Sequence, residues 1–296
     1  MRSSGCTEAN RSANASIWAL TSLDSAGSVV LLDVVSAAFA RPLHRSDVVG
    51  AFAGLRPLLA GESDETSKLS REHAVARVAP GLVAIAGGKY TTYRVMGSDA
   101  VDAAEAYLPH KIPASCTEKV PLLGADGYYA LTNQTTSIAR EHDVHPHRVT
   151  HLLNRYGSLI GDVLALAEGD RSLLEPLAGA PQYLRVEALY AAKAEGALHL
   201  EDVLARRTRI SIEYPDRGLE ASAEVADLIA PVLGWSAADI ARELENYGAR
   251  VAAEIESQGM PDDETADALR AAAPEARGEI LEPVPVPGVE HRASRH

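Results

Sequence analysis

Residues 81–94 read GLVAIAGGKYTTYR. The apolar, partly β-branched run Leu82–Ala86 is typical of a strand, and it ends at a pair of glycines. One of the threonines that follow offers an N-cap for a helix that we expect to run to about Leu108. The stretch therefore predicts a strand, a glycine turn and a helix, in that order.

The glycine turn has the chemistry of an anion site. Gly87 and Gly88 leave backbone N–H groups uncovered at the start of a helix, and Lys89 adds a positive charge. The motif is not a Walker A loop, because Val83 and Tyr90 stand where that loop needs a glycine and a hydroxyl residue. Since most glycine pairs at strand ends serve only as turns, both interpretations stay open at this point.

Two further apolar runs, residues 48–54 and 74–78, precede this stretch and are also typical of strands. Arg56 follows the first run and Arg71 precedes the second. Arginines at strand ends are commonly solvated, and that interpretation remains open here. If the strands bring both arginines to Lys89, the three cations would bind a phosphate or a carboxylate.

From about residue 125 onward the pattern is helical, with one alternating piece at 209–212 that predicts an extended segment. Before the strands, residues 1–28 predict little structure. Residues 29–39 fit a buried helix or a strand, and their length favours the helix, while 276–296 are a proline-rich tail. Pro146 suits the first turn of a helix, and Ser236 with Asp239 resembles a capping box. The expected helices cover residues 126–141, 146–156, 158–168, 182–195, 200–205, 219–233, 236–258 and 262–274.

The net charge of −13 divides the chain in two. Residues 1–116 hold 11 basic and 11 acidic side chains and are neutral overall. Residues 117–296 hold 17 basic and 30 acidic side chains and therefore carry the whole net charge. Such a part would be repelled by nucleic acid and by an anionic bilayer, whereas the neutral part can still receive a small anion. Two cysteines, no signal-peptide core and no apolar run of about 20 residues indicate a cytoplasmic protein without a membrane span.

Two clusters invite other interpretations. Four histidines, residues 142, 145, 147 and 151, have a spacing that suits a metal site, but solvated or capping histidines explain them as well. Arg206 is expected at a helix end beside Glu201 and Asp202, where it offsets the helix dipole. For Arg207 and Arg209 we expect an interdomain contact.

Four segments together resemble the FAD-dependent glycerol-3-phosphate dehydrogenases of the aerobic, quinone-linked kind. They are GLRPL at 54–58, KLSREH at 68–73, the stretch 81–94 and EGALHLEDVLARRTR at 195–209. The resemblance covers residues 29–275. It implies an α/β (α+β) remnant of a FAD/substrate-binding domain at 29–112, followed by an all-α C-terminal domain at 113–275.

The resemblance also implies a reaction. Proteins of this family oxidise sn-glycerol 3-phosphate to dihydroxyacetone phosphate by hydride transfer from the substrate C2 to the flavin N5, and pass the electrons to a quinone or another acceptor. By position, Arg56 and Arg71 match substrate-binding arginines, and Lys89 matches a lysine beside both the substrate and the reactive ring. The loop of Gly87, Gly88, Lys89, Tyr90 and Thr91 matches the one that meets the flavin.

The chain departs from the family pattern at one motif. A flavoprotein of this type begins with a G-x-G-x-x-G turn that holds the pyrophosphate, and no G-x-G-x-x-G occurs in these 296 residues. The family's general-base histidine also belongs to the part that precedes the resemblance. Three hypotheses therefore stand. The chain is part of a flavoenzyme, peripheral on the inner face of the cell membrane and a homodimer, or it is a non-catalytic helical interaction or dimerisation fragment without FAD. The third is a truncated product with no function of its own, whose apolar strands at 48–92 would be exposed and would aggregate.

Overall fold

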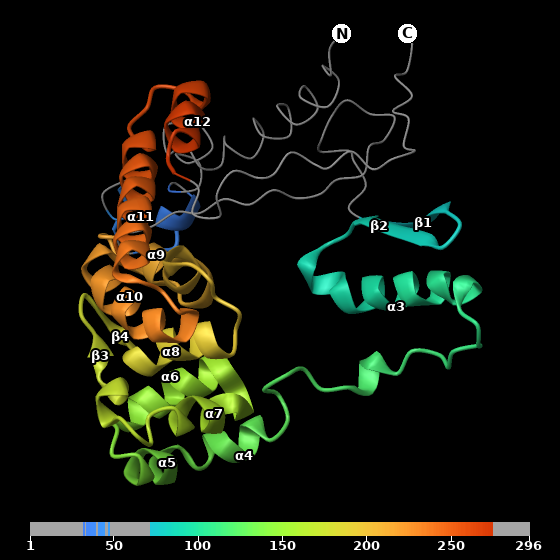
Figure 1. Cartoon of the computed structure of the whole chain (residues 1–296), viewed down its shortest axis with the longest axis horizontal. Coiled ribbons are helices and arrows are strands. Elements are labelled where there is room, and N and C mark those ends of the chain that lie inside the picture. Colours follow the sequence, from blue (N-terminus) through green and yellow to red (C-terminus); the bar gives the residue numbers. More distant parts are fainter. Residues whose placement is uncertain (1–31, 33, 40, 45–46, 48–71, 275–296) are drawn as a thin grey trace. The chain divides into compact units, whose positions relative to one another are not determined.

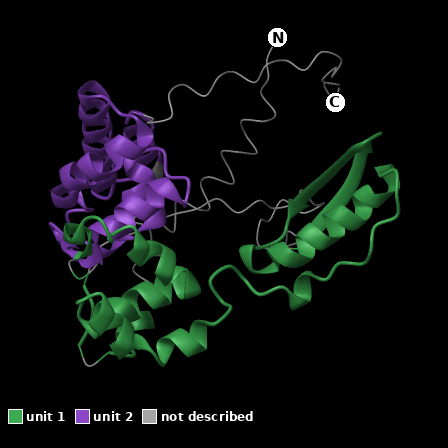
Figure 2. Ribbon diagram, turned by 60° about the horizontal axis from the view of Figure 1, so that its bottom comes forward, with its two compact units in different colours: residues 1–174 green, residues 175–296 purple. Residues whose placement is uncertain are grey.

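The computed structural model describes residues 32, 34–39, 41–44, 47 and 72–274 (Figure 1). The chain forms two compact units, residues 1–174 and 175–296, which are described separately (Figure 2). The predicted strand at 48–54, the segment 1–28 and the proline-rich tail lie outside the described residues. Of the helix predicted at 29–39, residues 34–36 are helical, but Val34 is 66% exposed and not buried. No helix in the described ranges is both long and apolar enough to cross a membrane.

The first unit contains the predicted strand–turn–helix. Strands β1 (His73–Ala79) and β2 (Leu82–Gly87) form an antiparallel hairpin, in which His73 stands opposite Gly87. A 3₁₀ turn, η3 (Tyr90–Thr92), leads into α3 (Tyr93–Ala104), and η4 (Glu105–Tyr107) ends it close to the predicted residue 108. Helix α3 lies along the hairpin and covers one face of it (Figure 1).

The rest of the first unit is helical. After η5 (Thr117–Lys119), the segment predicted as one helix at 126–141 is divided at residues 133–134. Helix α6 has the predicted bounds, with Pro146 in its first turn, and its buried face meets that of α7. The helices are α4 (Tyr128–Thr132), α5 (Thr135–Glu141), α6 (Pro146–Tyr156) and α7 (Ile160–Ala165), with 3₁₀ turns η6 (Gly157–Leu159) and η7 (Arg171–Leu174).

The second unit opens with a small hairpin that the sequence pattern did not predict. Strands β3 (Pro176–Leu177) and β4 (Ala180–Leu184) pair antiparallel, so the helix predicted at 182–195 begins only at residue 185. Glu187 fixes this start, because its carboxylate accepts a hydrogen bond of 2.9 Å from the amide of Leu184. The helices are α8 (Arg185–Lys193), the π-helix η8 (Asp202–Arg207), α9 (Ile210–Glu213), α10 (Leu219–Leu233), α11 (Ala237–Ser257) and α12 (Asp263–Ala271).

The extended segment predicted at 209–212 is wrong. Residues 210–213 form the single helical turn α9, and the amide of Tyr214 donates to the carbonyl of Ile210 at 3.1 Å. Ile210 is completely buried in the core of the second unit. Alternation over four residues fits a strand and one helical turn alike, and the burial of Ile210 selects the turn.

The core of the second unit gathers side chains from β4, η8, α8, α10 and α11. Its largest fully buried members are Tyr183, Leu177, Leu200, Leu204, Ile210 and Ile229. The predicted capping box is confirmed at α11, where the amide of Asp239 donates to Ser236 Oγ at 3.2 Å and the Asp239 carboxylate accepts from the amide of Ser236 at 2.8 Å. Helix α11 therefore begins where side chains satisfy its first free amides.

Candidate functional site

The glycine turn carries the chain from β2 into α3 through left-handed backbone. Gly87 and Gly88 have φ of +78° and +79° and are both buried. The amide of Gly88 donates to the carbonyl of Glu72 at 3.2 Å, which extends the pairing of the hairpin by one residue. A Cβ on Gly88 would stand 2.5 Å from Met96 Sδ and 3.2 Å from His73 Cβ. Glycine is therefore required at residue 88 by both conformation and space.

Hydrogen bonds between Lys89 and Thr92 cap the start of η3. The amide of Lys89 donates to Thr92 Oγ1 at 3.1 Å, and that hydroxyl donates to the Lys89 carbonyl at 3.0 Å. Tyr90 and Thr91 supply the first-turn amides, for which helix geometry offers no acceptor within the helix. The side chains of Lys89 and Tyr90 are exposed, Tyr90 to 91%. The turn thus presents backbone donors and a cation to an external anionic or carbonyl group.

His73 and Asp99 are a polar pair beside this turn that sequence reasoning missed. His73 Nε2 lies 2.7 Å from Asp99 Oδ2, and it joins the first residue of β1 to α3. His73 ends the KLSREH segment, but a single sequence gives no sign that Asp99, 26 residues later, is its partner.

The predicted site residues are only partly placed. Gly87, Gly88, Lys89, Tyr90 and Thr91 form the turn described above. Arg56 and Arg71 lie outside the described residues, so their convergence with Lys89 stays a prediction.

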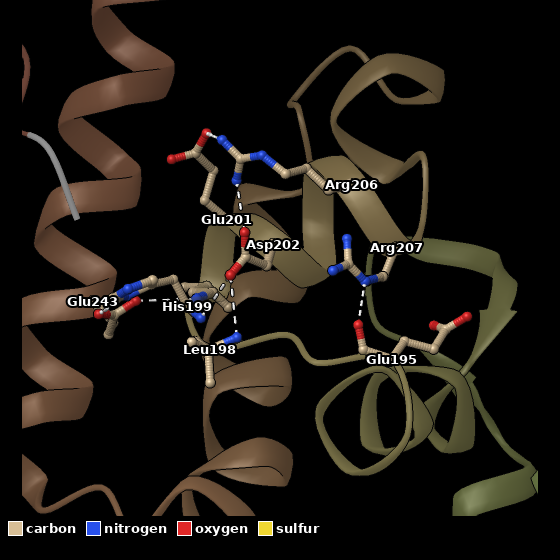
Figure 3. A network of polar contacts seen from close by, with 9 residues as sticks. Glu195, Leu198, His199, Glu201, Asp202, Arg206, Arg207 and Glu243 are labelled. Carbon is tan, nitrogen blue, oxygen red and sulfur yellow. Dashed lines mark hydrogen bonds and ion pairs between the residues drawn. The ribbon is translucent and has the colours of Figure 1, made fainter. Parts of the chain in front are cut away.

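A second polar cluster occupies the segment 195–209 (Figure 3). Asp202 Oδ2 accepts hydrogen bonds of 3.1 Å from the amides of Leu198 and His199. Glu243 of α11 is buried and accepts from the amide of Leu200 at 3.0 Å, and its other oxygen lies 2.9 Å from His199 Nδ1. This cluster ties the loop before η8 to α11.

The arginines of this segment have local partners. Arg206 pairs with Glu201 at 2.5 Å and with Asp202 at 3.0 Å, which confirms its expected neighbours. Arg207 Nε donates to the Glu195 carbonyl at 2.8 Å, and Arg209 pairs with Glu213 at 3.2 Å. These contacts lie within the second unit, and the interdomain role of Arg207 and Arg209 stays a prediction.

The electrostatics of Asp202 follow from its hydrogen bonds. Burial works to raise the pKa of this carboxyl, but the amides of Leu198 and His199 and the charge of Arg206 outweigh it. The pKa therefore lies below its ordinary value, and the carboxylate is charged at neutral pH. We assign this cluster a structural role.

The histidines of the first unit show capping. His145 Nδ1 accepts from the amide of His147 at 3.2 Å at the start of α6. In the part of the chain that the structure describes, no three His, Cys, Asp or Glu side chains are grouped to hold a metal ion.

Comparison with known proteins identifies the family. Residues 115–240 match the model for the C-terminal domain of alpha-glycerophosphate oxidase. Over 256 residues the chain is 66% identical to glycerol-3-phosphate dehydrogenase 2 of Mycobacterium tuberculosis strain H37Rv, which covers 86% of this chain and 44% of that protein. The chain belongs to the glycerol-3-phosphate dehydrogenase family. The enzyme of this name from Mycobacterium leprae is 63% identical over 254 residues, with 86% and 43% covered. The chain thus spans less than half the length of these relatives.

A solved structure shares the fold of this family member. Glycerol-3-phosphate dehydrogenase from Bacillus halodurans, crystallised in complex with FAD, matches with a TM-score of 0.60 and 22% identity. The match covers 76% of this chain and 44% of that one. It supports the predicted fold class, an α/β piece followed by a mainly helical part, to which β3 and β4 add one small hairpin.

The turn at residues 87–91 fits one part of a flavin. Two glycines without side chains, first-turn amides and an exposed lysine suit the polar edge of a planar ring that carries negative charge. The pyrophosphate would need a different set of donors, and a glycine-rich dinucleotide motif is absent from the sequence.

Proposed function

We propose that this chain forms part of an FAD-dependent dehydrogenase that oxidises sn-glycerol 3-phosphate to dihydroxyacetone phosphate. The observation that carries the proposal is the 66% identity over 256 residues to glycerol-3-phosphate dehydrogenase 2 of Mycobacterium tuberculosis. The exposed lysine and helix-start amides at residues 89–91 add support, because an anionic substrate and a flavin edge both need such donors.

Each proposed residue has a separate task. When bound, FAD would supply the hydride acceptor for the substrate C2. Gly87 and Gly88 would let the backbone approach the ring, and the amides of Tyr90 and Thr91 in η3, which leads into α3, would hold its polar edge. Lys89 orients the substrate and stabilises negative charge beside the ring. Arg56 and Arg71 bind the substrate phosphate through their guanidinium groups.

The remaining parts of the enzyme are proposed from the family resemblance. Residues that this sequence does not contain supply the pyrophosphate site, and a quinone or another acceptor takes the electrons. We place the protein in the cytoplasm, peripheral on the inner face of the membrane, as a homodimer. Residues 29–112 belong to the FAD/substrate domain and 113–275 to the helical domain. Sedimentation with inner-membrane vesicles and light scattering test the location and the dimer.

Flavin content and dye reduction test whether the chain catalyses the reaction on its own. Purified chain is examined for bound yellow flavin and for reduction of an artificial electron acceptor with sn-glycerol 3-phosphate. Lys89→Ala should lower any activity by about 100-fold, because a fixed charge beside the reacting atoms contributes several kcal/mol. Chain that carries neither flavin nor activity would refute independent catalysis.

A second function is a non-catalytic helical interaction or dimerisation module. It is favoured by one observation: the second unit has its own buried core, built from residues between 177 and 251. This hypothesis predicts partner binding that survives both Arg56→Ala and Lys89→Ala, whereas the flavoenzyme hypothesis predicts loss of substrate binding in both variants.

A further inference from the structure

The first residue of β1 and the second turn of α3 are joined next to the glycine turn. His73 stands opposite Gly87 in the hairpin register, and its Cβ limits the space at Gly88. Its Nε2 lies 2.7 Å from Asp99 Oδ2, and because a carboxylate only accepts, Nε2 is the donor. The His73 side chain is 19% exposed and that of Asp99 47%.

Helix α3 lies along the β1–β2 hairpin (Figure 1), and three polar contacts join β1 to α3 and to η4, which follows it. His73 contacts Asp99, Arg77 Nε donates to the carbonyl of Ala103 at 3.2 Å, and the hydroxyl of Tyr107 donates to the carbonyl of Ala79 at 3.4 Å. Asp99 and Ala103 belong to α3, and Tyr107 ends the 3₁₀ turn η4 that follows it. Of the three contacts, His73–Asp99 lies at the end of the hairpin where the glycine turn begins.

The same helix face packs on the turn. Met96, three residues before Asp99, places its sulfur 2.5 Å from where a Cβ on Gly88 would lie. The position of the Gly88 backbone is therefore set by Met96 from the helix and by His73 from the strand. The His73–Asp99 hydrogen bond holds the strand that carries His73 at a fixed distance from the helix that carries Met96.

We propose that His73 and Asp99 are a positioning pair, which holds the turn at residues 87–91 so that the amides of Tyr90 and Thr91 keep the orientation that would receive the flavin edge. The inference rests on the proposed function for the identity of the ligand. Neither residue needs to touch the ligand, because both act through the backbone of the turn.

Hydrogen exchange on the whole chain without flavin tests the positioning role. His73→Ala and Asp99→Ala should each speed exchange of the amides at 87–92 by about tenfold, the loss of one charge-assisted hydrogen bond. His73→Gln should restore slow exchange, because a glutamine amide nitrogen can reach the place of Nε2. Tyr107→Phe, which removes the contact at the far end of the same helix, should leave these amides unchanged. Equal exchange at 87–92 in all variants would overturn the proposal.

An FAD titration of the same variants tests the ligand. Quenching of flavin fluorescence should show about tenfold weaker binding in His73→Ala and Asp99→Ala, no further loss in the double variant and recovery in His73→Gln. If the wild-type chain binds FAD and the His73→Ala and Asp99→Ala variants bind it with the same affinity, the pair does not position the turn for flavin. A wild-type chain that binds no FAD would contradict independent flavin binding under the proposed function, while the exchange result would still decide whether the pair positions the turn.

Discussion

At the scale of the residue, Gly88 is the most constrained position of the candidate site. Gly88→Ala should destabilise the chain by about 2 kcal/mol, because alanine is strained at φ of +79° and its Cβ displaces Met96 and His73. Gly81→Ala is a matched control with nearly the same φ and nothing within 4 Å, so it should cost only about 1 kcal/mol. Urea unfolding measures both, and equal losses would contradict the contact with Met96.

In the second unit, the buried carboxylate of Glu243 holds the loop before η8. Glu243→Ala should lower the free energy of unfolding by about 3 kcal/mol, because it leaves the buried amide of Leu200 without its acceptor and removes the contact with His199. Glu245→Ala, two residues away and exposed, should change stability by less than about 0.5 kcal/mol. If the two variants unfold alike in urea, the buried cluster is not what stabilises this loop.

The turn at 87–91 could be predicted from sequence, but its supports could not. Glycine pairs, an adjacent lysine and hydroxyl residues are local signals, and they placed the turn correctly. His73–Asp99 and Glu243–Leu200 join residues 26 and 43 positions apart, and nothing in a single sequence marks such partners.

At the scale of the element, helices with both an apolar stripe and a cap were predicted best. Helices α6, which has Pro146 in its first turn, and α10 have the predicted bounds. Helix α11 begins one residue after its predicted start. The errors fall where the local pattern is short: α9 is one turn, and β4 continues directly into α8. In both places buried side chains of the second unit, Ile210 and Tyr183, override the local pattern.

The start of α11 should respond to acid. Hydrogen bonds from the Ser236 side chain and amide, with help from Arg242, lower the pKa of Asp239 from 3.8 to about 2. Because the folded pKa is the lower one, this stabilisation is present above the unfolded pKa of 3.8 and is lost as pH falls toward 2. Asp239→Asn should therefore be less stable than wild type at pH 6, and the difference should shrink between about pH 4 and 2. Urea midpoints measure it, with Glu245→Gln as the control, and a pH-independent difference would contradict the cap.

At the scale of the whole molecule, the helices of the second unit and the β1–β2 hairpin of the first should differ in protection. Val225 and Ile229 of α10 are fully buried, whereas Val78 and Leu82 of the hairpin are 60% and 53% exposed. We expect amides of α10 and α11 to exchange at least about 100-fold more slowly than those of β1 and β2, because slow exchange requires opening of a buried core. Mass spectrometry after hydrogen exchange measures both, and equal protection would mean that the exposed hairpin face is covered.

We propose that these residues can serve a glycerol-3-phosphate dehydrogenase, and a chimera tests this. In the most direct measurement, this chain replaces the matching 256 residues of glycerol-3-phosphate dehydrogenase 2 from Mycobacterium tuberculosis, and sn-glycerol 3-phosphate is added without oxygen. We predict that the chimera binds FAD, that the substrate bleaches the yellow flavin, and that Lys89→Ala slows bleaching about 100-fold while FAD stays bound. A folded chimera that binds FAD but is not bleached by sn-glycerol 3-phosphate would contradict the account.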